Sequence, residues 1–164
     1  MHGVGPGPPT KNCRGPMKSE SAPTQPQDGA TFCVTERVRW ADVDRNGIIF
    51  FGAYARFIDV AEGEFYRSLG FTHAELEKLG VDLTRVHVEF DFFKPARLDE
   101  ELSLRARPTG VGLHSARLKI DVYRSDDEAL LAEITMVSAC VDRNGKSAPI
   151  PPAFAEALRA RTTR

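Results

Sequence analysis

The pattern that decides the fold lies in residues 52–70, GAYARFIDVAEGEFYRSLG. The apolar residues there recur at helical spacing and form one wide stripe: Tyr54, Phe57, Ile58, Ala61, Phe65 and Leu69. Most of the charged residues fall outside that stripe: Arg56, Asp59, Glu62 and Arg67. Gly70 is a natural end for the helix. A helix with so wide an apolar stripe must be covered by the rest of the chain, so the sequence predicts a central, buried helix.

The sequence that follows this helix changes to the two-residue period of β-strands. Four strands are predicted there, at residues 83–93, 101–107, 113–124 and 129–142, with turn residues such as Pro108-Thr109-Gly110 between them. Such short connections predict antiparallel neighbours. In the third of these strands apolar residues alternate with charged ones, so one face of the sheet is expected to be core and the other to meet solvent.

Three smaller elements complete the predicted order. A strand at residues 31–40 precedes the long helix, with Val38 and Trp40 on its buried face, and short helices are predicted at residues 72–79 and 152–161. The predicted fold class is therefore α+β, with the long central helix wrapped by a curved antiparallel β-sheet. This arrangement resembles the hot-dog fold.

Length and composition predict one domain, residues 31–164, behind a tail formed by residues 1–30. The 164 residues are 41% hydrophobic, which is enough for one core. Residues 1–30 are rich in proline and glycine and have few branched apolar side chains, so we expect them to be disordered. No apolar run is long enough to span a membrane or to form a secretory signal, which predicts a cytoplasmic protein without a membrane partner.

Charge and cysteine content argue against two other classes of protein. The net charge of −1 and the lack of a basic cluster predict that nucleic acid is not a partner. Cys13, Cys33 and Cys140 form an odd set without CxxC spacing, so neither a disulfide framework nor a zinc site is expected.

An acidic turn, DVDRNG at residues 42–47, comes directly before the long helix. Asp42, Asp44, Asn46 and Gly47 match the first half of a calcium-binding EF-hand loop, but position twelve is Ala53 in place of the bidentate glutamate. Calcium is therefore disfavoured. A second interpretation is purely structural, because Asx side chains and an Asn-Gly pair shape tight turns.

A third interpretation of the acidic turn is chemical. Asp44 is followed by the apolar run of residues 48–51 and then by a helix N-terminus, a placement that can tune a carboxylate for chemistry. Residues 39–70, RWADVDRNGIIFFGAYARFIDVAEGEFYRSLG, resemble the signature segment of the 4-hydroxybenzoyl-CoA thioesterase family, hot-dog enzymes that act on acyl-CoA thioesters. The resemblance implies that Asp44 is the catalytic carboxylate and that the Phe51 amide stabilises the developing negative charge, with Gly52 beside it.

The expected substrate is an acyl-CoA with an apolar or aromatic acyl group. The apolar residues around the acidic turn form the expected wall of its pocket: Ile48, Ile49, Phe50 and Tyr54. His87 could line a pocket shared with a neighbouring subunit, although with Glu89 and Asp91 it is better explained as the polar face of a strand than as a metal site. The turn at residues 110–114 has no basic residue other than a histidine. Arg117 and Lys119 are therefore the first candidates for binding CoA, with Arg143 and Lys146 as alternatives.

The sequence thus predicts an acyl-CoA thioesterase that uses no metal and no redox cofactor. A lone hot-dog unit leaves a sheet edge open, so a homodimer with joined sheets is expected, and the resemblance implies a homotetramer. Two alternatives stay open: a thioesterase for acyl-carrier-protein thioesters, and a non-catalytic module that binds acyl-CoA.

Overall fold

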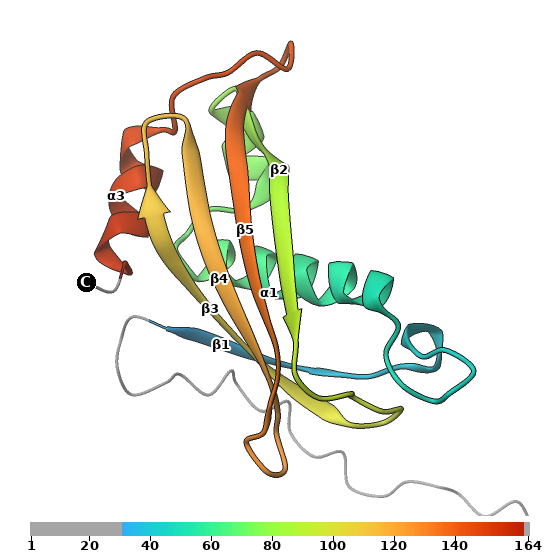
Figure 1. Ribbon diagram of the computed structural model, residues 1–164. Helices are drawn as coiled ribbons and strands as arrows, with labels where there is room; N and C mark the ends of the chain where they lie inside the picture. Colours follow the sequence, from blue (N-terminus) through green and yellow to red (C-terminus); the bar gives the residue numbers. More distant parts are fainter. Residues whose placement is uncertain (1–30, 163–164) are drawn as a thin grey trace, which may run out of the picture.

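A computed structural model describes residues 31–162 as one sheet packed against helices. The strands are β1 (Phe32–Arg37), β2 (Val81–Phe92), β3 (Glu101–Val111), β4 (Ser115–Arg124) and β5 (Leu130–Asp142), and the helices are α1 (Tyr54–Ser68), α2 (His73–Lys78) and α3 (Pro152–Ala160). The long helix α1 crosses one face of the curved sheet (Figure 1). The predicted α+β hot-dog class is confirmed, whereas the predicted tail at residues 1–30 lies outside the described residues.

The sheet has the strand order β1-β3-β4-β5-β2, and every neighbouring pair is antiparallel. The short connections had predicted that consecutive strands are neighbours, and this was wrong for β2 and β3. Strand β2 pairs with β5 at one edge, while β3 pairs with β1 at the other. The chain therefore crosses the sheet between β2 and β3. As a consequence, β2 is an edge strand with one side unpaired in the part of the chain that the structure describes.

The core lies between α1 and the inward faces of the strands. In β4, Ala116, Leu118, Ile120 and Val122 are buried, as the alternation predicted. From α1, the Phe65 side chain is fully buried, and its ring lies 6.0 Å from the ring of Phe32 on β1. The predicted apolar stripe of α1 thus faces the sheet and packs against it.

The ends of two predicted strands were wrong. The first strand stops at Arg37, and residues Trp40–Asp42 form a short 3-10 turn in which the Trp40 side chain is 79% exposed, not buried. Strand β3 continues through Pro108 to Val111, because a bulge lets the strand pass the proline and still pair with β4. The chain reverses after β3, where the Gly112 N–H donates to the Ser115 carbonyl over 2.8 Å.

The short helix α2 has the capping box that its sequence suggests. The Thr72 hydroxyl accepts from the Glu75 N–H over 3.3 Å, and the Glu75 carboxylate accepts from the Thr72 N–H over 3.2 Å. None of the helices between residues 31 and 162 is long and apolar enough to cross a membrane.

Candidate active site

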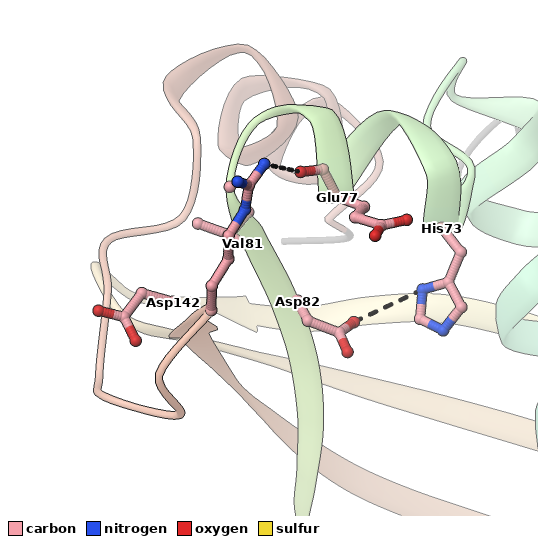
Figure 2. A pocket seen from close by; sticks show the side chains of 7 residues that line it. His73, Glu77, Val81, Asp82 and Asp142 are labelled. Carbon is pink, nitrogen blue, oxygen red and sulfur yellow. Dashed lines mark hydrogen bonds and ion pairs between the residues drawn. The ribbon is translucent and has the colours of Figure 1, made fainter.

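A hollow with a charged lining lies between α2 and the start of β2 and has a volume of about 240 Å³. Figure 2 shows its charged lining, with the His73 imidazole 3.5 Å from the Asp82 carboxylate and the Arg143 guanidinium donating to the Glu77 carbonyl. Asp142 accepts from two amides of its own turn, those of Asn144 and Lys146. These side chains form their hydrogen bonds and ion pairs with neighbouring residues, so this hollow is a weak candidate for a catalytic site.

A second hollow, of about 420 Å³, lies between α1, α2 and β2. The Glu62 carboxylate on its wall is buried and pairs with the Arg85 guanidinium, which also reaches Asp59 over 2.7 Å. Burial, together with the charge of Glu62, raises the pKa of the nearby Tyr66 hydroxyl well above its ordinary value. Glu62 was predicted outside the buried stripe. It is buried because Arg85 reaches from β2 to neutralise it.

The third hollow lies at the N-terminal end of α1 and is mostly apolar. It has a volume of about 340 Å³, and its lining includes four residues that the sequence assigned to the site: Ile48, Ile49, Phe51 and Tyr54. Phe50, which was also predicted for the wall, is not part of the lining. The exposed rings of Phe92 and Phe93, from the end of β2, form the opposite wall. Lys94, which the sequence did not assign to the site, also lines this hollow. An apolar hollow beside a helix N-terminus can bind an acyl group.

The acidic turn folds as a small hairpin, which we call the acidic hairpin (residues 42–50). Val43 and Ile49 form an antiparallel bridge, and the Asp44 N–H donates to the Ile48 carbonyl over 2.9 Å. At the tip, Gly47 has a φ of 72°, a left-handed conformation that favours glycine. The hairpin carries Asp44 on one arm and leads along the other arm into the first residues of the helix.

The Asp44 carboxylate is half-buried and turns back toward its own hairpin. Its Oδ1 atom accepts from the Asn46 N–H over 2.7 Å, which is the Asx geometry expected of a structural turn. This bond uses one lone pair of one oxygen, so the carboxylate keeps acceptor capacity for a substrate or a water molecule. Asp44 is not part of an ion pair within residues 31–162, and it does not itself line the apolar hollow.

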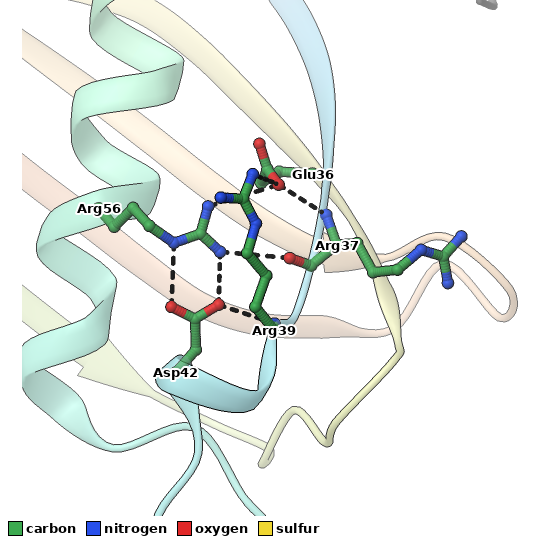
Figure 3. A network of polar contacts seen from close by, with 5 residues as sticks. All are labelled: Glu36, Arg37, Arg39, Asp42 and Arg56. Carbon is green, nitrogen blue, oxygen red and sulfur yellow. Dashed lines mark hydrogen bonds and ion pairs between the residues drawn. The ribbon is translucent and has the colours of Figure 1, made fainter.

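Asp42, the other aspartate of the hairpin, has a structural role. Figure 3 shows the Arg56 side chain reaching from α1 to both carboxylate oxygens of Asp42, over 2.9 Å and 2.5 Å. The Arg39 N–H donates to the same carboxylate over 2.8 Å. With both oxygens engaged by donors, Asp42 is a poor ligand for a cation, which weighs further against the calcium interpretation. Asp44 therefore keeps acceptor capacity for a ligand, whereas both oxygens of Asp42 are already engaged.

The contacts of Asp42 change its affinity for a proton. Burial alone would raise the pKa of the Asp42 carboxyl, but the hydrogen bonds and positive charges of Arg56 and Arg39 outweigh it and lower the pKa. A folded-state pKa below the unfolded one contributes stability that is present above the unfolded value, about pH 4, and is lost as the pH falls through the folded value.

We therefore expect Asp42→Asn to lower the free energy of unfolding at pH 7 by about 1.5–3 kcal/mol. We also expect this variant to lose less stability than the wild type on acidification below about pH 4. Urea unfolding followed by circular dichroism between pH 7 and pH 3 measures both effects. The exposed Asp126→Asn is the matched control and should follow the wild type. Equal stability of Asp42→Asn and wild type at pH 7 would contradict the assignment.

The start of the helical segment presents unpaired backbone donors. Residues Phe51–Ala53 form a 3-10 turn that runs into α1, and no acceptor within residues 31–162 bonds the amides of Phe51 and Gly52. A helix N-terminus combines such free N–H groups with a favourable dipole for negative charge. A Cβ atom at Gly52 would lie 2.9 Å from the Phe50 ring, so glycine lets this ring pack over the turn.

The other predicted site residues lie apart from this hollow within the chain. His87 is exposed on β2, and its cross-strand partner Val137 is itself opposite Arg117 of β4. The alternation of β4 places Arg117 and Lys119 on the face of the sheet away from α1. The Lys119 ammonium is held by Glu133 over 2.9 Å, whereas Arg117 forms no ion pair within the described residues. Arg117 is thus the freer of the two cations.

Comparison with known proteins agrees with this architecture. A model of the thioesterase-like superfamily matches residues 38–158. The acyl-CoA thioesterase YbgC of Haemophilus influenzae is 27% identical over 130 residues, which cover 79% of this chain and 92% of the relative.

Solved structures give the same result for the fold. The 1,4-dihydroxy-2-naphthoyl-CoA thioesterase Slr0204 of Synechocystis has a TM-score of 0.73 at 24% identity, covering 79% of this chain and 96% of that one. The protein SAV2348 of Staphylococcus aureus, solved in complex with CoA, has a TM-score of 0.74 at 15% identity, covering 80% and 83%. Because the family model spans most of the described residues, the chain belongs to the thioesterase-like superfamily, and the predicted class of hot-dog thioester hydrolase is confirmed.

Proposed function

We propose that the protein hydrolyses an acyl-CoA to the free acid and CoA at the apolar hollow beside the N-terminus of α1. The proposal rests on three features that lie together at the N-terminal end of α1. The hollow is lined by Phe51 and Tyr54, the Phe51 and Gly52 amides are free, and the acidic hairpin with Asp44 leads directly into them. A thioesterase needs an apolar acyl pocket, donors for the carbonyl oxygen and a carboxylate.

In the proposed reaction the Phe51 N–H stabilises the negative charge that develops on the thioester carbonyl oxygen. Asp44 acts in one of two ways. Its carboxylate attacks the carbonyl carbon, the C–S bond breaks, CoA leaves as the thiolate, and water hydrolyses the mixed anhydride. In the other route Asp44 takes a proton from a water molecule that attacks the same carbon, and the C–S bond breaks to release CoA. Both routes give the free acid and the thiol, and neither consumes a redox cofactor.

The apolar lining supports an apolar or aromatic acyl group. Tyr54 lies edge-on to Phe90, and its ring is 5.0 Å from that of Phe92, so the Tyr54 side of the hollow is part of an aromatic cluster. Lys94 at the same hollow, and the exposed Arg117 on the far face of the sheet, are the cations we propose for the phosphates of CoA. The thioesterase relatives from H. influenzae and Synechocystis, whose names specify CoA esters, support the choice of CoA.

A homodimer is part of this proposal. The unpaired side of β2 exposes Val86 and His87, and an edge strand with apolar residues is suited to pair with a second copy. In such a dimer His87, on the paired edge strand, lies at the interface with the second copy. Light scattering coupled to size-exclusion chromatography tests the dimer and the further expectation of a tetramer, and a monomer would count against both.

A thiol-release assay over a panel of acyl-CoAs tests the proposed activity. We expect turnover of acyl-CoAs with apolar or aromatic acyl groups by the wild type, unaffected by a chelator. Faster turnover of the matched acyl-carrier-protein thioesters would favour the carrier-protein alternative. Tight acyl-CoA binding without turnover, measured by calorimetry, would replace the enzyme with a binding module.

A further inference from the structure

We propose that Arg56 is a positioning residue for this reaction, because it fixes the acidic hairpin that carries Asp44 against the start of the helix that carries the Phe51 amide. The inference rests on the proposed function, and it concerns a residue that does not touch the reacting atoms. Arg56 lies in the first turn of α1 and is only partly exposed, with 28% of its side chain accessible.

The guanidinium of Arg56 connects the helix to the base of the acidic hairpin. Its Nε and Nη2 atoms bond both oxygens of the Asp42 carboxylate, a bidentate geometry that fixes orientation as well as distance. The backbone carbonyl of the same Asp42 accepts from the Phe50 N–H over 3.2 Å. Through Asp42, Arg56 therefore holds both arms of the hairpin, including the residue directly before Phe51.

The guanidinium is itself held on its other side. It donates to the Arg37 carbonyl over 3.2 Å, approaches the Glu36 carboxylate to 3.4 Å, and lies 4.3 Å from the centre of the Phe57 ring. Figure 3 shows the polar contacts from β1 and the hairpin converging on this guanidinium. A planar fork with this many fixed partners leaves the side chain little freedom to follow a moving hairpin.

Two other backbone contacts of the hairpin lead away from α1. The Ile49 N–H donates to the Ala96 carbonyl over 2.9 Å, and Ile48 bridges to Arg97, so these bonds tie the hairpin to the segment before β3. Toward the helix, the Phe50 carbonyl accepts from the Ala53 N–H over 3.0 Å, and the Asp42–Arg56 pair is the ion pair that joins the hairpin to α1 among the described residues. Without Arg56 the hairpin keeps its outer anchor but can tilt relative to the helix, which changes the distance between the Asp44 carboxylate and the Phe51 amide.

Arg56→Ala should therefore lower kcat by about tenfold to a hundredfold, because a misplacement of about 1 Å can have effects of that size. KM should change by less than about threefold, since Arg56 does not line the acyl hollow. Millimolar guanidinium should restore part of the lost kcat, because it can refill the space beside Asp42. A purely structural role predicts loss of folded protein without such rescue. Arg39→Ala is the matched control: its exposed guanidinium bonds Glu36 but not Asp42, so kcat should stay unchanged.

Hydrogen exchange of the Phe50 amide tests the proposal without any turnover. This amide donates to the Asp42 carbonyl, so it should exchange faster in Arg56→Ala than in wild type, whereas Arg39→Ala should match the wild type. Unchanged exchange, or full kcat in a folded Arg56→Ala protein beside an inactive Asp44→Asn, would overturn the positioning role alone. An inactive wild type, or a fully active Asp44→Asn, would instead overturn the proposed function.

Discussion

Asp44→Asn is expected to lower kcat by about a hundredfold to ten-thousandfold, the range for removal of a catalytic acid or base. Asparagine retains a side-chain oxygen that can accept from the Asn46 N–H, so the hairpin should keep its shape. What it loses is the negative charge and basicity that both proposed routes need. KM and the free energy of unfolding should change little, because the substitution is isosteric.

The comparison with Asp42→Asn makes this result specific. Asp42 lies two residues away and is bonded by Arg56 and Arg39, so its substitution should lower stability, whereas substitution of Asp44 should not. Thiol release measured at saturating substrate gives kcat for both variants, and urea unfolding gives their stability. Hydrolysis at the wild-type rate by Asp44→Asn would remove this carboxylate from the reaction.

Phe65→Ala is expected to have the largest effect on stability, lowering the free energy of unfolding by about 3–5 kcal/mol. The Phe65 side chain is fully buried on α1, where its ring lies 6.0 Å from that of Phe32 and 5.8 Å from that of Tyr66. Alanine would leave a cavity between the helix and β1 that rigid neighbours cannot fill.

Urea unfolding followed by tryptophan fluorescence and circular dichroism measures this loss. Leu113→Ala provides a control for removal of an apolar side chain, because Leu113 is exposed in the turn between β3 and β4. Its effect should stay within about 0.5 kcal/mol. Equal effects of the two substitutions would show that α1 is not packed on the sheet as described.

The central helix and the strand pattern could be predicted because burial leaves a strong periodic signal. The stripe on α1 and the alternation in β4 both report which side chains face the core. The position of β2 at the far edge could not be predicted, because pairing with β5 depends on contacts between distant segments rather than on local period. Likewise Pro108 marks a turn by its type, but a bulge accommodates it inside β3.

The candidate site was predictable only in part. Asp44 and Phe51 stand in a distinctive segment, and the structure places the Phe51 side chain at an apolar hollow. Lys94 and Arg56 gave no comparable signal, because a single basic residue is usually part of a solvated surface. Their roles in the structure come from contacts with other segments of the chain: Lys94 follows β2 yet lines the same hollow as Ile49, and Arg56 in the first turn of α1 bonds Asp42 at the base of the acidic hairpin.

The pairing of β1 with β3 has a consequence for the order in which the protein folds. Cys33 on β1 and Ser103 on β3 touch across 70 residues of chain, so β1 can dock only after β3 exists. Closing so long a loop is slow, and topologies dominated by such pairings fold in about milliseconds to seconds. Since the acidic hairpin follows β1 directly, we expect enzymatic competence to appear in the last kinetic phase of refolding, after most of the helical signal has formed.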